Sequence, residues 1–194
     1  MFWRRRLPHW IPEEAIVFVA WRLAGTMPQP SAAILTNSPS IGRSFLRDDR
    51  QLDRTRNGPQ WLRDPRVAAM FIKALLYGET VRGFYTLFAW VVMPNHVHLV
   101  LQPRSELGDL MRWLKTATAV RANRIIGGTG RAFWRREYFD RCIRSEKELG
   151  SVMRYVENNP VSAGLAASPE EWPWSSAAKK EPAARPPAFS FSAF

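Results

Sequence analysis

The chain has 194 residues, of which 46% are hydrophobic and nine are tryptophan, enough apolar material for one domain with a buried core and too much for wholesale disorder. It carries 28 Lys and Arg residues against 17 Asp and Glu residues, a formal net charge of +11. A positive surplus of this size favours a polyanionic partner, above all nucleic acid. Charge alone would also fit an anionic lipid surface, or no such partner at all.

The single cysteine, Cys142, excludes an internal disulfide and a zinc finger. The basic start of the chain is followed by prolines and acidic residues rather than by a long apolar run, so we expect no signal peptide. No stretch approaches the roughly 18 apolar residues that a membrane span needs. We therefore expect a cytoplasmic, nucleoid-associated protein that does not bind membranes.

The first half of the chain contains signals for a strand, a loop and a helix. Residues 15–23 are β-branched and aromatic, which predicts a strand. Residues 24–60 are rich in Gly, Pro, Ser and Arg and predict a long loop excursion. Asp64 and Pro65 predict the start of a helix, because Asp caps the first turn, Pro fits within it, and apolar residues then recur at helical spacing.

The middle of the chain predicts a hairpin and a second helix. Residues 85–93 and 96–102 have the composition of strands, and Pro94-Asn95 between them predicts a turn or bulge. Ser105 is a candidate cap for a helix that runs to the glycine-rich break at Gly127.

The last third predicts one more strand and one more helix. Residues 133–143 are aromatic and predict a strand, and Ser145 to Glu148 form a capping-box pattern that opens a helix ending at Pro160. The order β-α-β-β-α-β-α predicts an α+β fold, a ferredoxin-like antiparallel sheet with helices packed on it. We expect one domain over residues 1–178 and a disordered Pro/Ala-rich tail over residues 179–194.

Two histidines stand two residues apart in the second hairpin strand. Because alternate residues of a strand share a face, His96 and His98 should project together, away from Val97, Leu99 and Leu101. Two neighbouring imidazoles can hold a divalent metal. Taken alone, the pattern fits two half-buried, hydrogen-bonded histidines better than it fits a metal site.

The last predicted helix carries a second pair of polar candidates. Tyr155 and Asn159 are i, i+4 neighbours to one side of its apolar stripe, where they could supply a nucleophile and an oxygen ligand beside the sheet. The competing interpretations are a packing tyrosine and an asparagine that caps the helix before Pro160. Glu157 is near Tyr155 in sequence but should point elsewhere on the helix.

These residues belong to three spaced segments, 93–98, 154–165 and 171–176, that read MPNHVH, RYVENNPVSAGL and EWPWSS. Together the segments resemble the single-tyrosine HUH transposases, and within them the REP-associated tyrosine transposases, which act on repetitive extragenic palindromes. The resemblance covers residues from about 15 to about 177.

The resemblance implies a fold of the HUH endonuclease type, with His96 and His98 as ligands of Mg²⁺ or Mn²⁺ and Tyr155 as the nucleophile. It implies Asn159 as the third protein ligand, at a position where many relatives have Gln. The implied activity is that of a DNA transposase, a single-strand endonuclease and strand transferase that works through a 5′-phosphotyrosine intermediate. The implied partner is single-stranded and hairpin DNA, bound by a monomer or a homodimer.

A basic and aromatic segment after the second predicted helix is the candidate DNA-binding region. Arginines would contact phosphates and aromatic rings would stack on bases. The competing interpretation, a solvated basic face over core aromatic residues, accounts for about half of the set. The candidates are Arg121, Arg124, Arg131, Trp134, Arg135, Arg136 and Arg141.

Three other functions fit parts of the pattern. A domesticated relative could bind palindromic DNA without moving it. A rolling-circle initiator or relaxase shares the histidines and the tyrosine but is usually joined to further domains, and this chain has no phosphate-binding Gly-x-x-x-x-Gly-Lys-Ser/Thr loop. A metal-dependent phosphoesterase would typically have carboxylates around the histidines, and residues 90–103 contain none.

Overall fold

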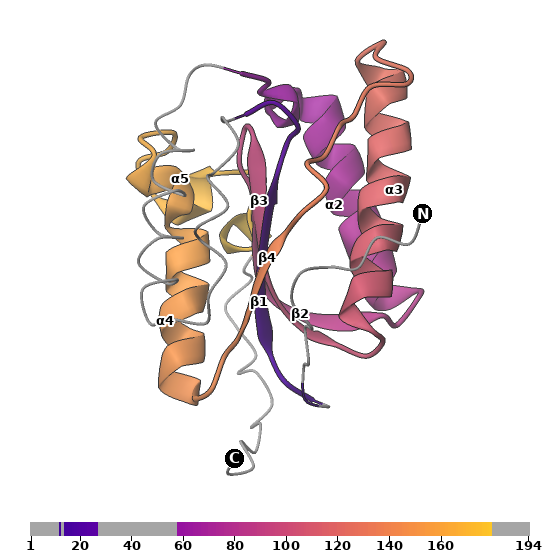
Figure 1. Ribbon diagram of the computed structural model, residues 1–194. Coiled ribbons are helices and arrows are strands. Elements are labelled where there is room, and N and C mark those ends of the chain that lie inside the picture. Colours follow the sequence, from indigo (N-terminus) through magenta and orange to yellow (C-terminus); the bar gives the residue numbers. More distant parts are fainter. Residues whose placement is uncertain (1–11, 13, 27–57, 180–194) are drawn as a thin grey trace, which may run out of the picture.

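The computed structural model describes residue 12, residues 14–26 and residues 58–179. Most of the loop excursion expected at residues 24–60 and nearly all of the tail expected at residues 179–194 lie outside these ranges. The described residues form one antiparallel sheet with a layer of helices on each of its two faces (Figure 1).

The sheet contains β1 (Val17–Arg22), β2 (Tyr85–Val92), β3 (His96–Pro103) and β4 (Phe139–Cys142), in the order β2-β3-β1-β4. One face is covered by α2 (Pro65–Thr80) and α3 (Leu107–Ile125), and the other by α4 (Glu146–Glu157), which continues into the short α5 (Asn159–Ser162). Short 3-10 turns are η2 (Trp61–Arg63), η3 (Pro169–Glu171) and η4 (Ala177–Lys179). This arrangement confirms the predicted ferredoxin-like α+β fold. No helix in the described ranges has the length and apolarity needed to cross a membrane.

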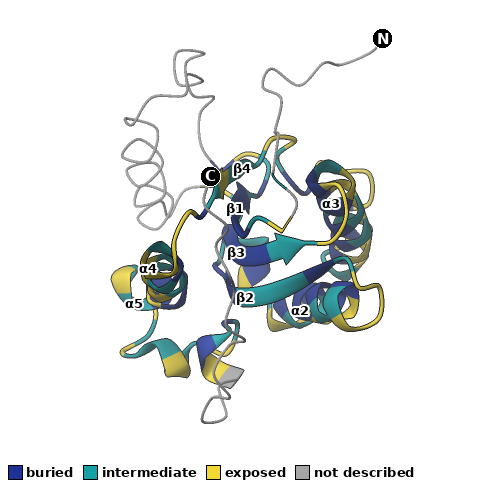
Figure 2. Ribbon diagram, turned by 90° about the horizontal axis from the view of Figure 1, so that it is seen from below, coloured by how far each residue is buried: buried dark blue, intermediate teal, exposed yellow. Residues whose placement is uncertain are grey.

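The register of β1 against β3 separates the two layers. Val17, Val19 and Trp21 lie opposite Leu101, Leu99 and Val97, and all six residues are buried in the larger core under α2 and α3. The residues between them face the smaller core under α4, where Phe18 lies opposite Val100 and Ala20 opposite His98. Figure 2 shows the buried residues gathered where the helices meet the sheet.

Two of the three predicted helix caps are present. Asp64 accepts a hydrogen bond from the amide of Arg66 at 2.9 Å and caps α2, and Ser145 accepts one from Glu148 at 3.2 Å and caps α4. The expectation for Ser105 was wrong, because α3 begins one residue later with Glu106 at the cap position and without a side-chain cap. Pro160 does not end α4, which stops at Glu157; it lies in the first turn of α5.

The strand expected over residues 133–143 is much shorter. Only Phe139–Cys142 pairs with β1, and Trp134 makes one isolated bridge to Leu23. Between these two contacts, the Lys115 ammonium of α3 donates hydrogen bonds of 2.7 Å to the carbonyls of Arg135 and Arg136. Those carbonyls are bound by a helix side chain, so the strand is interrupted there.

Trp134 belongs to the larger core rather than to a DNA-stacking surface, which corrects the expectation from the sequence. Its side chain is only 7% exposed, and its ring packs against those of Trp21 and Phe71 at centroid distances of 5.7 and 5.8 Å. Its indole N–H donates a hydrogen bond of 2.9 Å to the buried Thr118 hydroxyl. A ring held on all sides in this way has no face for a base.

The segment after α5 returns to the sheet and covers the outer edge of β2. The amide of Val92 donates to the Trp174 carbonyl at 2.8 Å, and the amide of Ser176 donates to the Trp90 carbonyl at 2.9 Å. The Trp172 indole donates to the Val92 carbonyl at 3.0 Å. Residues 172–176, which belong to the EWPWSS segment, thus bind the edge of β2, and we call them the edge clamp.

Replacing Trp134 with Ala should lower the free energy of unfolding by roughly 3–5 kcal/mol, the usual cost of deleting a large core aromatic side chain. Trp134→Phe should cost less, since it keeps most of the packing and loses the hydrogen bond to Thr118, worth about 1 kcal/mol. Chemical denaturation of both variants measures this. An unfolding midpoint for Trp134→Ala equal to that of the wild type would contradict the core assignment.

Candidate active site

The two histidines of β3 lie on the α4 face, as their spacing predicts. Their ring centroids are 4.7 Å apart with the planes at 78°, and His96 and His98 are 2% and 0% exposed. The neighbouring Val97 and Leu99 are fully buried on the opposite face. Two imidazoles this close could together hold one divalent cation, because imidazole is a common ligand of transition metals.

Asn95, which the sequence marked only as part of a turn, orients the first histidine. Its side-chain oxygen lies 2.6 Å from Nδ1 of His96, and the residue is 4% exposed. Because an amide oxygen can only accept, Nδ1 of His96 is the donor, and in the neutral imidazole Nε2 then keeps its lone pair. Such a neighbour selects the tautomer that presents Nε2 to a metal. In the sequence, the signal for this role of Asn95 is a polar residue immediately before the His-x-His pair.

Tyr155 of α4 faces the histidines across the smaller core. Its ring centroid lies 6.0 Å from that of His98 and 6.4 Å from that of Phe18, edge to face in both cases. Phe18 in turn stacks on His98, with the centroids 5.5 Å apart and the planes within 18°. The Phe18 ring therefore acts as a spacer that touches both the tyrosine and the imidazole.

Asn159 follows Tyr155 by one turn but lies beyond the end of α4. Asn158 occupies the C-cap position and donates its amide to the Arg154 carbonyl at 2.9 Å, so the alternative that Asn159 caps this helix is wrong. Asn159 begins α5 and is 2% exposed. Within the described ranges there is no cluster of three or more His, Cys, Asp or Glu side chains. Among the described residues, a third protein ligand beside the histidines would be of another type, such as an amide.

Glu157 points away from the tyrosine, as expected, and has a structural partner that the sequence did not reveal. It is 7% exposed, and its carboxylate accepts a hydrogen bond of 3.1 Å from the Ser176 hydroxyl. The same hydroxyl oxygen accepts a hydrogen bond of 3.0 Å from the Trp90 amide. The edge clamp thus ties the end of α4 to β2, which sets the position of the helix that carries Tyr155.

Cys142 offers no competing nucleophile. It lies on β4 with its side chain against the larger core, on the face of the sheet opposite the histidines. Burial raises the pKa of its thiol, and the nearby Asp140 carboxylate raises it further. A thiol held in its protonated form is a poor nucleophile.

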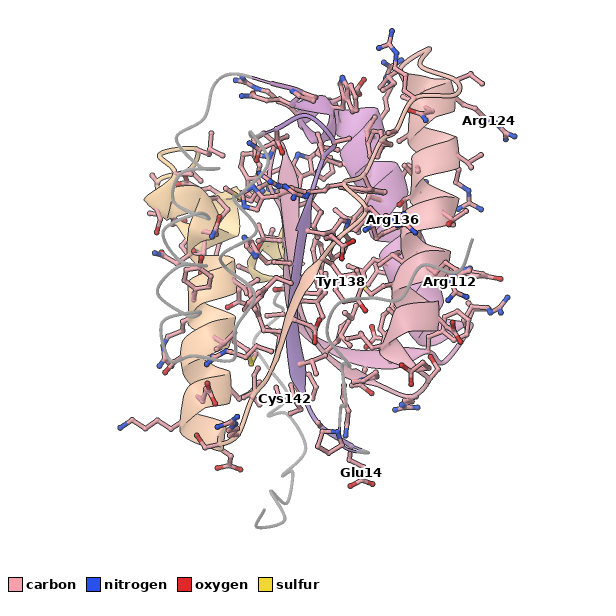
Figure 3. All side chains as sticks on the ribbon, viewed as in Figure 1. Glu14, Arg112, Arg124, Arg136, Tyr138 and Cys142 are labelled. Carbon is pink, nitrogen blue, oxygen red and sulfur yellow. The ribbon has the colours of Figure 1, made fainter. Side chains whose placement is uncertain are left out.

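The arginines expected to bind DNA do not form one patch. Arg121, Arg124 and Arg131 are exposed on α3 and on the loop after it, and Figure 3 shows Arg124 projecting from the outer side of α3, away from the sheet. Arg141 is on the opposite side of the protein, where it forms a 2.7 Å ion pair with Glu148 of α4. Arg135 and Arg136 lie on the interrupted strand between these two regions.

Comparison with known proteins finds similarity to DNA transposases. Residues 71–159, which include the histidines, Tyr155 and Asn159, match the family described as IS200-like transposases. A Haemophilus influenzae protein assigned as a REP-associated tyrosine transposase is 28% identical over 116 residues, covering 52% of this chain and 64% of that relative. The match thus spans less than two thirds of the relative's length.

A solved structure has the same fold. The REP-associated tyrosine transposase bound to a REP hairpin superposes with a TM-score of 0.56 at 18% identity, over 92% of this chain and 84% of that one. These comparisons confirm the resemblance inferred from the sequence. The chain is similar to the IS200-like transposases, and among them to the REP-associated tyrosine transposases.

If the two histidines hold a divalent metal, loss of the Asn95 side chain should weaken its binding by roughly 10- to 100-fold, the usual effect of removing the group that orients a histidine ligand. Asn95→Leu removes the acceptor for His96, whereas Asn95→Asp keeps an oxygen in the same place and should retain most of the affinity. Titration with Mn²⁺, followed by calorimetry, measures both variants. Equal Mn²⁺ affinities for Asn95→Leu and the wild type would show that Asn95 has no part in metal binding.

Proposed function

We propose that this protein is a DNA transposase that cuts and rejoins single-stranded DNA with Tyr155 as its nucleophile. The observation that carries the proposal is the meeting of three side chains from two elements, with His98 at 4.7 Å from His96 and at 6.0 Å from Tyr155 between ring centroids. A purely packing tyrosine would not explain why its ring lies beside one member of a buried pair of imidazoles. The similarity to IS200-like transposases supports the same conclusion.

The donor set fits a divalent metal such as Mg²⁺ or Mn²⁺. His96 would present Nε2, because Asn95 holds the proton on Nδ1. His98 would supply the second nitrogen and Asn159 an amide oxygen. Imidazole nitrogen suits transition metals and carbonyl oxygen suits Mg²⁺ or Mn²⁺, so a mixed set of this kind fits Mn²⁺ at least as well as Mg²⁺. When bound, such a metal supplies Lewis-acid polarisation of the scissile phosphate.

The chain's own residues account for the bond exchange. The Tyr155 oxygen forms a bond to phosphorus while the bond from phosphorus to the 3′ oxygen breaks, leaving a 5′-phosphotyrosine and a 3′-hydroxyl. The phenolic proton is lost to solvent and the departing oxygen takes one up. Because the phosphotyrosine link conserves the free energy of the phosphodiester bond, the step needs no ATP and a later 3′-hydroxyl can reverse it. Phe18 holds the tyrosine ring beside His98 for this attack.

Hairpin DNA is the proposed substrate. The solved structure with this fold is described as bound to a REP hairpin, and the excess of positive charge here, +11, suits a polyanion. Exposed arginines at the end of α3 would contact the phosphates of such a hairpin. The recognised element would combine a duplex stem with a single strand that reaches Tyr155.

Tyr155→Phe should abolish covalent attachment to DNA while changing hairpin affinity by less than about threefold, because only the hydroxyl is lost and the ring keeps its packing. A labelled single-stranded hairpin incubated with Mn²⁺ should yield an adduct that survives denaturing electrophoresis for the wild type alone, and addition of EDTA should prevent it. An undiminished adduct with Tyr155→Phe would place the nucleophile on another residue.

Arg121 and Arg124 should each account for about one phosphate contact. Replacing both with Ala should flatten the log–log dependence of hairpin affinity on salt by about 1.4, at roughly 0.7 per contact on single strands. Replacing both with Lys keeps the charge and should leave the slope unchanged. If the Ala variant has the slope of the wild type, the DNA surface lies on another face of the protein.

A further inference from the structure

Arg22, the last residue of β1, lies directly across the sheet from His96. The antiparallel register pairs these two residues, and directly opposed residues project to the same face with their Cβ atoms about 5 Å apart. The residues on either side of Arg22 in the chain, Trp21 and Leu23, are buried in the core under α2 and α3. Arg22 therefore belongs to the face that carries the histidines and Tyr155.

Arg135 lies next to Arg22, on the side away from His96. Leu23 and Trp134 form an antiparallel bridge and both are buried in the larger core. The amide of Arg135 donates to the Arg22 carbonyl at 2.9 Å, which places the two arginines side by side on the opposite face. His96, Arg22 and Arg135 thus form a row across the sheet, and we call Arg22 and Arg135 the arginine row.

Both arginines of the row are half-buried, unlike the exposed arginines of α3. A guanidinium with part of its surface removed from water gains more from an anionic ligand than one on the open surface does. Its planar fork of N–H groups matches two oxygens of a phosphate. The groups on the same face, His96 opposite Arg22 and His98 with Tyr155 beside it, point to the same kind of ligand, a phosphodiester undergoing attack.

We propose that Arg22 is a catalytic residue that binds a nonbridging oxygen of the scissile phosphate, and that Arg135 binds the next phosphate along the same strand. This inference rests on the proposed function. As the bond from the Tyr155 oxygen to phosphorus forms and the bond to the 3′ oxygen breaks, negative charge builds up on the nonbridging oxygens. Arg22 donates hydrogen bonds to that charge without giving up a proton.

Arg22 differs from two other arginines, Arg141 and Arg112, in its position relative to the histidines. Arg141, which is on the same face, is engaged by Glu148 at 2.7 Å. Arg112 is on the far helical layer, with a 77% exposed side chain in a 2.9 Å ion pair with Asp109, and projects away from the sheet (Figure 3). Arg112→Ala is therefore the matched control, since it removes the same charge from a place that the cleavage step does not use.

The test is the single-turnover rate of covalent attachment to a single-stranded hairpin, measured with saturating protein and Mn²⁺. Arg22→Ala should slow attachment by about 10²- to 10³-fold, the usual effect of losing one donor to a developing oxyanion. Hairpin affinity should fall by less than about tenfold, and Mn²⁺ affinity should be unchanged. Arg135→Ala should mainly weaken binding, and Arg112→Ala should match the wild type in rate.

A neutral substrate identifies the contact. A methylphosphonate at the scissile position lacks one charged oxygen, so it should slow the wild type strongly and Arg22→Ala much less. If Arg22→Ala proves unfolded by circular dichroism, Arg22→Gln keeps the aliphatic stem and provides the same comparison.

The possible failures are distinct. A wild-type protein that forms no adduct overturns the proposed function and this role with it. A wild-type adduct combined with an undiminished rate in the Arg22 variants, or equal methylphosphonate effects in both proteins, overturns only the role of Arg22.

Discussion

The side chains of β3 alternate between two layers of helices, and the candidate site depends on that alternation. Val97, Leu99 and Leu101 fill the core under α2 and α3, so the histidines between them can face only α4. A slip of one residue against β1 would drive both imidazoles into the apolar core and three aliphatic side chains toward the tyrosine. The packing under α2 and α3 thus fixes the positions of the site residues that face α4. The same register brings Arg22 opposite His96, so the proposed phosphate contact depends on it too.

Much of the fold could be predicted because it follows from short-range patterns. The helices, the hairpin and the shared face of His96 and His98 each depend on periods of two to four residues, and the structure confirms them. The pairing of Tyr155 with these histidines connects elements more than fifty residues apart, so periodicity alone offered only a possibility. The family resemblance made that pairing specific, and the ring distances agree with it. The roles of these residues and of Asn159 stay predictions until cleavage is measured.

What the sequence could not predict depends on contacts between distant segments. Trp134 looked like a stacking residue because its neighbours are arginines, but its ring is enclosed by residues of β1 and α2. The predicted strand around it was too long because Lys115, on another element, takes two of its carbonyls. Arg22 carried no local signal at all, since its importance comes from its cross-strand partner. Asn95 looked like a turn residue, and only the geometry reveals its hydrogen bond to His96.

The edge clamp also affects how the molecule meets its neighbours. An open edge strand presents unpaired amides and carbonyls that can recruit a strand from another chain. Along β2 several of these groups are already taken, since the amide of Leu87 donates to Glu79 at 2.7 Å and those of Trp90 and Val92 donate to the clamp. Growth of the sheet on this side, whether by domain swapping or by amyloid-like stacking, would first require the clamp to peel away. The edge clamp therefore leaves fewer open backbone groups on this edge for another chain to pair with.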